Sequence, residues 1–512
     1  PNPKPQTQNP KPQTPNPGWV GLLSNKIEVR YGAHNKMTKM LAKSLALLLS
    51  LCWMCFSKEE SDLTPVMIVT VTRHGARTPN NDAVKLDWTS NLGKSELTDF
   101  GRFQQYLLGQ TLRHEYPQLL DKPLTSKEYF LRSSKKPRTI DSALYFFKGI
   151  NNYPHALEHL KLDEESLSHI RPPFRTDKVF STLQYLLPEY KFAQIGEPVI
   201  LTKPDQSGDP LLKNHKEDVC PAGKAKAKES IRPTIDSAIE KSKEVLDSVA
   251  FLIKKKLKLE NNVDFKFMKS LGDVATSDYF HRKDSAVLSV TEPLGNYIVN
   301  INAINHLSAY RDRNFIKVAI SNLLKDILLH IKQKTDPTSP SSKKLVAYSA
   351  HDTNLSPLLS FLNLTDFDCN LRQLSSEQNL GCALKPPYSS NLLFEVDKDS
   401  RGKYWIATRY NGEFIDLCQK SLQGKKICPL EEFVKKMKEG VYENEDEMKQ
   451  FCKAEDVLKE KVSVKEDAPK RYVELYVIVV AVAIIVVGVM TLRYKRSAEN
   501  KKRLIDARQK QK

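Results

Sequence analysis

The sequence has few cysteines and no motif typical of a bound metal. Its 512 residues include eight cysteines, and only Cys52 and Cys55 form a C-x-x-C pair. Elsewhere no cluster of histidine and cysteine residues has the spacing of a zinc site. These absences argue against zinc fingers and zinc ribbons, and we expect neither a metal nor another cofactor.

The central part of the chain also lacks a large excess of basic residues, although the formal net charge is +18. Residues 1–60 carry eight basic and three acidic side chains, and residues 493–512 carry nine and two. The 432 residues between these ends therefore have a formal charge of only +6. Because a nucleic-acid-binding domain concentrates basic residues on one face, we do not expect this chain to bind nucleic acid.

Charged residues are nearly absent from an apolar stretch near the N-terminus. Residues 41–56 contain one charged side chain, Lys43, and Lys39 precedes them. A basic start followed by an apolar run is typical of a secretory signal peptide, which we place at residues 37–57. Residues 1–36 open with a proline-rich repeat that cannot pack a core. We expect them to be a disordered extension or a gene-model artefact.

A second apolar stretch, residues 475–492, contains no charged residue. As a helix it would be about 27 Å long, close to the roughly 30 Å hydrocarbon core of a bilayer. The basic residues at 493–512 predict a cytosolic tail. We therefore expect a single-pass type I membrane protein whose main domain, residues 58–470, is lumenal or extracellular. A lysosomal or endosomal membrane and the cell surface remain open alternatives.

The cysteines outside the signal peptide form an even set, which in an exported chain predicts disulfides. These six residues, which allow fifteen pairings, are Cys220, Cys369, Cys382, Cys418, Cys428 and Cys452. Two sequons for N-glycosylation begin at Asn354 and Asn363. We expect glycosylation at Asn363, whereas Asn354 lies beside the candidate active site and is expected to stay unmodified.

The hydrophobic pattern predicts an α/β fold. Residues 66–72 and 345–349 are short apolar runs typical of buried strands. Apolar residues recur with helical spacing in 98–113, 234–259 and 315–334. Alternation of helices and strands favours a sheet flanked by helices, with the site beyond the carboxyl ends of its strands.

Residues 73–79 read R-H-G-A-R-T-P and directly follow the first predicted strand. The imidazole of His74 can attack phosphorus, and the guanidinium groups of Arg73 and Arg77 can hold phosphate oxygens. A second polar pair, His351 and Asp352, follows the second predicted strand. Both segments therefore lie where an α/β sheet places its site, and they indicate phosphate chemistry.

The motif at 73–79 resembles the signature of the histidine acid phosphatase branch of the histidine phosphatase superfamily. Further segments resemble that family in the same order, at 97–104, 130–143, 348–353 and 428–433. The resemblance implies a mixed, mostly parallel sheet flanked by helices, with a mainly helical inserted cap. The one C-terminal transmembrane helix, predicted above from residues 475–492, completes the expected fold. It places the α/β core at about 62–148 and 335–455 and the cap at about 150–330.

The resemblance implies a role for each matching residue. His74 is the nucleophile, neutral at its attacking nitrogen while the other nitrogen donates to a backbone carbonyl, and Asp352 is the proton donor. The substrate-binding residues are Arg73, Arg77, Arg138 and, as an imidazolium, His351; Arg132 is left as structural. The expected reaction is hydrolysis of phosphate monoesters at acid pH, through a phosphohistidine intermediate.

The resemblance also reduces the number of possible disulfide pairings. It implies Cys418–Cys428 and Cys220–Cys452, which leaves Cys369 with Cys382. Dimerisation is common among relatives, so a homodimer is a further expectation. Two other classes of function remain open at this point: a phosphomutase, which uses the same histidine to move a phosphoryl group, and a catalytically inert relative that serves as a receptor or adhesion ectodomain.

Overall fold

The computed structural model describes residues 63–453, apart from 87–88, 90, 153–159, 161–172, 174–197, 203–208, 214–215, 217–218, 282–292, 377–378 and 419–425. The predicted signal peptide, transmembrane span and cytosolic tail lie outside the described residues, as does the proline-rich start. Among the helices that are described, none is long and apolar enough to cross a bilayer.

The centre of the fold is a seven-stranded mixed sheet. Its main path runs β2 (Tyr129–Ser133), β3 (Leu345–Ala350), β1 (Thr64–Arg73), β4 (Asn391–Lys398), β5 (Tyr404–Tyr410) and β6 (Glu413–Ile415), and β7 (Ile427–Pro429) pairs with β5. Strands β2, β3 and β1 are parallel, whereas β4 to β7 pair antiparallel. The expectation of a mostly parallel sheet is therefore wrong.

Two of the antiparallel pairs, β4–β5 and β5–β6, have a local cause. Strands β4 and β5 are joined by a tight turn in which Gly402 has φ +82°, and β5 and β6 by a turn in which Gly412 has φ +88°. Glycine adopts this left-handed region without strain, so the chain reverses there instead of crossing over through a helix. Short turns of this kind join antiparallel neighbours only, because parallel neighbours need a long crossover.

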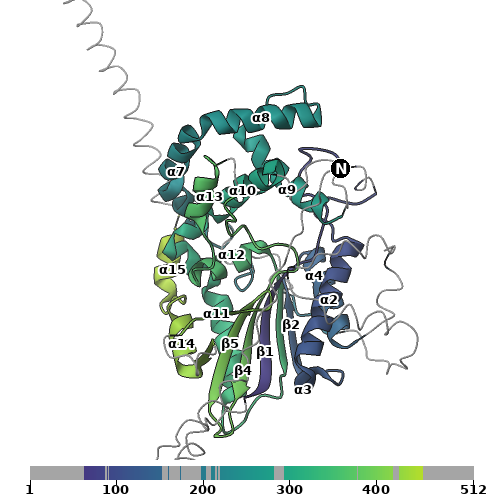
Figure 1. Cartoon of the computed structure of the whole chain (residues 1–512). Helices are drawn as coiled ribbons and strands as arrows, with labels where there is room; N and C mark the ends of the chain where they lie inside the picture. The colour runs from purple at the N-terminus through teal and green to yellow at the C-terminus, as the bar shows by residue number, and fades with distance from the viewer. Residues whose placement is uncertain are drawn as a thin grey trace, which may run out of the picture. The chain divides into compact units, whose positions relative to one another are not determined.

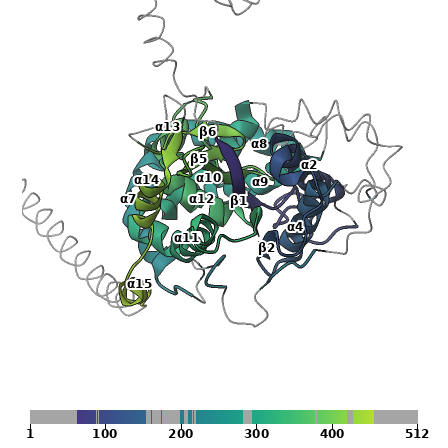
Figure 2. The ribbon, with the colours of Figure 1, turned by 90° about the horizontal axis from the view of Figure 1, so that it is seen from below.

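Helices cover both faces of the sheet. Helices α2 (Asp99–Glu115), α3 (Pro117–Leu120) and α4 (Pro137–Ile150) pack on one face, and α11 (Arg313–Thr335), α12 (Asp352–Phe361) and α14 (Leu430–Lys438) on the other. Figure 2 shows α2 and α4 on one side of β1 and α11 and α14 on the opposite side. Alternate residues of β1 enter the two cores: Met67 and Val69 face α11, and Ile68 faces α2.

Four further helices form what the resemblance assigns to a cap, here called the cap helices: α7 (Gly223–Lys241), α8 (Lys243–Leu257), α9 (Phe265–Tyr279) and α10 (Pro293–Leu307). Figure 1 shows them beyond one end of the sheet. The single helix expected at 234–259 is interrupted, because Ser242 leaves helical geometry (φ −104°, ψ 12°) and separates α7 from α8.

Helix α11 covers the range 315–334 that was expected to be helical. Most of it lies within the range expected for the cap, yet the helix packs on the sheet. The hydroxyl of Tyr348, on β3, donates to Asp326 of α11 at 2.6 Å. The rings of Phe130, on β2, and His330, on α11, are 4.5 Å apart. The boundary of the cap expected near residue 330 therefore falls inside a helix of the core.

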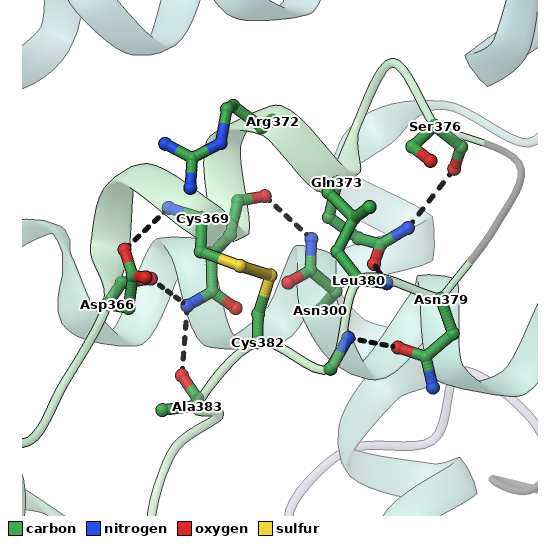
Figure 3. The surroundings of a disulfide bond; sticks show 12 residues. Asn300, Asp366, Cys369, Arg372, Gln373, Ser376, Asn379, Leu380, Cys382 and Ala383 are labelled. Atoms are coloured by element: carbon green, nitrogen blue, oxygen red, sulfur yellow. Dashed lines mark hydrogen bonds between the residues drawn. A yellow bond between two sulfur atoms is a disulfide. The ribbon is translucent and has the colours of Figure 1, made fainter.

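The described part of the chain has three disulfides, and they join the pairs expected from the resemblance. They are Cys220–Cys452, Cys369–Cys382 and Cys418–Cys428. Figure 3 shows the second of these at the start of α13 (Phe367–Gln373), where Asp366 accepts a hydrogen bond from the backbone N–H of Cys369 at 2.7 Å. The first closes the largest loop, since its cysteines are 232 residues apart. It also ties the start of the cap helices to α15 (Glu445–Cys452).

Candidate active site

The two sequence motifs meet at the ends of adjacent parallel strands. Strand β1 pairs with β3 in a register that places Arg73 opposite Ala350. The residues that follow, His74 and His351, therefore lie side by side, with ring centroids 5.5 Å apart. The backbone N–H of His74 donates to the carbonyl of Ala350 at 3.1 Å, which joins the two loops directly. Parallel pairing thus brings together segments nearly 280 residues apart in the chain.

The ring of His74 is held in one orientation. Its Nδ1 lies 2.8 Å from the carbonyl oxygen of Gly75. A carbonyl can only accept, so Nδ1 carries the proton and Nε2 has the free lone pair. Burial, together with the charges of Arg73, Arg138 and Arg77, lowers the pKa of His74 well below its usual value. The ring is therefore neutral, with a nitrogen available for attack.

The loop that carries His74 is fixed by a close approach to helix α2. A Cβ atom placed on Gly75 would come 2.1 Å from the carbonyl oxygen of Gly101, so only glycine fits there. The backbone N–H of Gly75 donates to Ser142 at 3.1 Å, and that of Ala76 donates to Gln104 at 2.9 Å. These contacts fix the position of the loop that carries His74.

The guanidinium of Arg73 is completely buried behind His74. It donates to the carbonyl of Pro386 at 2.6 Å, lies 3.0 Å from the carboxylate of Asp352, and stacks 4.3 Å from the ring centroid of Tyr388. The other motif arginine, Arg77, pairs with Asp273 of helix α9 at 2.9 Å. Both guanidinium groups are therefore anchored through their Nη atoms.

Three arginines keep unused donors close to His74. The buried Nε atoms of Arg73, Arg77 and Arg138 have no hydrogen-bond partner among the residues that the structure describes. Burial lowers the pKa of Arg138 to about 10, so this group is still cationic at neutral pH. A cluster of buried, unsatisfied guanidinium donors around a neutral imidazole is suited to hold a phosphate group against that imidazole.

The expectation that His351 is an imidazolium is not supported by its surroundings. Its Nδ1 faces Nη2 of Arg138 at 3.4 Å, and an arginine can only donate, so Nδ1 is an acceptor. Its Nε2 lies 2.8 Å from the hydroxyl of Ser134. Burial and the positive charge of Lys213 lower the pKa of His351 well below its usual value. A neutral ring that donates through Nε2 satisfies these contacts.

Asp352 is the first residue of helix α12, and its carboxylate pairs with Arg73. Its Oδ1 accepts a hydrogen bond from the backbone N–H of Thr353 at 2.9 Å. Burial alone would raise the pKa of Asp352, but Arg73, His306 and Lys385 hold it well below its usual range. A role as proton donor therefore requires a bound phosphate dianion to offset these cations and raise that pKa.

The site also contains residues that the sequence did not single out. A cavity of about 390 Å³ opens in front of His74, and its wall includes Lys213, Asp273, His306 and Lys385. These residues come from cap helices and from loops that lack a motif, so their position was not readable from spacing. By contrast Arg132, expected to be structural, pairs with Asp209 at 3.0 Å.

Comparison with known proteins finds a matching family and several relatives. The sequence profile of the histidine phosphatase superfamily (branch 2) matches residues 66–411 of this chain. Prostatic acid phosphatase of Homo sapiens is 23% identical over 393 residues, which cover 72% of this chain and 83% of that protein. Lysophosphatidic acid phosphatase type 6 of Mus musculus is 22% identical over 353 residues, which cover 67% of each protein.

Among solved structures, Hafnia Alvei phytase in complex with tartrate has a similar fold. The TM-score is 0.52 at 15% sequence identity, and the match covers 76% of this chain and 98% of the phytase. At this identity the likeness concerns the fold alone.

Proposed function

The chain belongs to the histidine phosphatase superfamily (branch 2), and from this membership we propose that it is an acid phosphatase. It hydrolyses phosphate monoesters at acid pH and releases an alcohol and inorganic phosphate. The observation that carries the proposal is the set of three buried guanidinium groups with free Nε donors around the neutral ring of His74.

In the first step, Nε2 of His74 attacks phosphorus and forms a phosphorus–nitrogen bond. Arg73, Arg77 and Arg138 hold the non-bridging oxygens, whose charge they stabilise in the transition state. The bond from phosphorus to the alcohol oxygen breaks, and Asp352 gives its proton to that oxygen. The products of this step are the alcohol, a phosphohistidine and an ionised Asp352.

In the second step, a water molecule attacks the phosphohistidine from the side that the alcohol has left. Asp352, now a carboxylate, takes a proton from this water, the phosphorus–nitrogen bond breaks, and inorganic phosphate leaves. The hydrogen bond from Nδ1 of His74 to Gly75 holds the ring in place through both steps. Asp352 is then protonated again, as it was in the complex with the substrate.

We further propose that the domain faces an oxidising compartment. Three disulfides support this, because such bonds persist in secreted, lumenal and extracellular proteins. The predicted signal peptide and membrane span are consistent with export to a lysosomal or endosomal membrane or to the cell surface. Homodimerisation and the absence of nucleic-acid binding remain predictions from the sequence.

The test is hydrolysis of p-nitrophenyl phosphate by the full chain, made in a secretory host and solubilised in mild detergent. Activity is measured with EDTA present from acid to mildly alkaline pH. We expect activity in acid that is abolished by His74→Ala and unaffected by His114→Ala, a change at an exposed histidine of helix α2. A folded, disulfide-bonded wild-type protein without activity on any monoester would overturn the proposal and favour an inert relative.

A further inference from the structure

The cavity in front of His74 carries more positive charge than one phosphate group needs. Among the described residues, two arginines and four lysines line it, against two carboxylates. These charged residues are Arg77, Arg138, Lys213, Lys216, Lys269, Lys385, Asp273 and Asp352. Each carboxylate already has an arginine partner, since Asp273 pairs with Arg77 and Asp352 with Arg73. The lysines are therefore the excess.

Lys385 is the most deeply buried of these lysines, with 8% of its surface exposed. The next residue, Pro386, accepts a hydrogen bond from Arg73, which fixes this loop against the catalytic motif. The ammonium of Lys385 forms no ion pair or hydrogen bond with any residue that the structure describes. It nevertheless lies close enough to Asp352 for its charge to lower the pKa of that carboxyl.

Lys213 reaches the cavity from a different segment. Its backbone N–H donates to the carbonyl of Asp209 at 2.7 Å, and Asp209 is held by Arg132, so the base of this loop is anchored to β2. Its side chain lowers the pKa of His351 by its charge. Within the described part of the chain, its ammonium too has no ion pair or hydrogen bond.

Both lysines line the cavity that also contains His74 and Asp352. The charge of Asp352 acts on Lys213 and on Lys385, so the carboxyl that protonates the leaving alcohol lies within the field of both. Arg73, Arg77 and Arg138 already supply donors to the phosphate. Holding an ammonium in a buried place without an anionic partner is costly, so the lysines favour a ligand that brings a further negative charge.

We propose that the cavity selects phosphate monoesters whose alcohol part carries a second anionic group, a carboxylate or a further phosphate, with Lys213 and Lys385 as its ligands. The inference rests on the proposed phosphatase function and adds the class of substrate. Burial and the charges of Lys216 and Arg138 lower the pKa of Lys213 to about 7. Selection by Lys213 is therefore strongest in acid, where the ammonium is fully charged.

The experiment compares two monoesters that differ in one group. 3-Phosphoglycerate has a carboxylate where glycerol 3-phosphate has a hydroxymethyl group. The full chain is assayed on both by release of inorganic phosphate. We expect kcat/KM to favour 3-phosphoglycerate, and each of Lys213→Met and Lys385→Met to lower the ratio of the two kcat/KM values by about tenfold or more, since hydrogen bonds to charged groups contribute that much. The control is Lys254→Met, at an exposed lysine of α8, which leaves the ratio unchanged.

Each outcome decides one question. A wild-type enzyme that hydrolyses both esters with equal kcat/KM, or lysine variants that slow both esters equally, overturns the inference and leaves the phosphatase function standing. Failure of the wild-type enzyme on both esters and on p-nitrophenyl phosphate overturns the phosphatase function itself. The conservative variant Lys385→Arg retains the charge, so its ratio of the two kcat/KM values is expected to be higher than that of Lys385→Met. Thermal unfolding of each variant checks that it is folded.

Discussion

The carboxylate of Asp273 lies 2.9 Å from Nη2 of Arg77, although the two residues are 196 positions apart. Asp273 also accepts a hydrogen bond from the backbone N–H of Asn80 at 2.9 Å. A cap helix, α9, therefore holds both an arginine of the catalytic motif and the loop that follows it. This contact makes α9 part of the candidate site.

Asp273→Asn should lower activity without removing the nucleophile. The amide keeps an acceptor for Asn80 but loses the charge that orients Arg77, so we expect kcat/KM for p-nitrophenyl phosphate to fall by about tenfold or more. Asp273→Ala should also destabilise the fold by about 3 kcal/mol, because it leaves a buried guanidinium unpaired. Steady-state kinetics and denaturant unfolding measure these effects, with Asp236→Asn, an exposed site on α7, as the control. An unchanged kcat/KM in Asp273→Asn would show that activity does not depend on the way Asp273 orients Arg77.

Asp352→Asn should affect poor leaving groups most. Alkyl phosphates release an unstable alkoxide and need a proton, so we expect a loss of roughly 10²–10⁴ in kcat on glycerol 3-phosphate. The loss on p-nitrophenyl phosphate should be smaller, because its leaving group is a stable anion. In the wild-type enzyme, activity should fall as pH rises through the pKa of Asp352 in the enzyme–substrate complex. Equal losses on the two substrates would exclude Asp352 as the proton donor.

Asp397, on β4, should make the fold less stable as pH rises. Burial and the charge of Glu395 raise the pKa of Asp397 to about 8, whereas an unfolded aspartate titrates near 3.9. The folded state binds this proton more tightly, so its contribution to stability is present in acid and is lost between these two pH values. Asp397→Asn removes the dependence, and the melting temperature of the variant relative to wild type should rise steadily with pH over that window. A constant difference would contradict this assignment.

The three disulfides should differ in how much they stabilise the fold. Cys220 and Cys452 are 232 residues apart, whereas Cys418 and Cys428 are 10 apart. The loop-closure model gives a loss of about 5 kcal/mol for removing the first and about 3 kcal/mol for the second. Paired replacement by serine, followed by denaturant unfolding, tests this order. A larger loss at Cys418–Cys428 would mean that native contacts and not chain entropy dominate.

The two sequons should be used differently. Asn363 is exposed, whereas Asn354 is 1% exposed and donates through its amide to the carbonyl of Leu212 at 2.8 Å. We expect a glycan on Asn363 only, seen as a shift in mass that Asn363→Gln removes. A glycan found at Asn354 by peptide mass spectrometry would be incompatible with the packing of α12.

Much of the architecture was predictable because its signals are local. The β-branched run before R-H-G-A-R-T-P became β1, and the apolar spacing in 315–334 became α11. The antiparallel half of the sheet was missed, because pairing direction depends on turns and neighbours that a strand pattern does not encode. The interruption at Ser242 was missed because the apolar spacing continues across it.

The amino-acid sequence was enough to identify the candidate nucleophile, the candidate phosphate-binding arginines and their carboxyl partner, since a strand followed by a motif places such residues at one edge of a sheet. Their surroundings depend on how distant segments pack. Asp273, Lys213 and Lys385 enter the site from separate segments, and the charge state of His351 depends on Lys213 and on burial. Such contacts arise from packing between distant parts of the chain, and electrostatic fields act through space and not along the sequence.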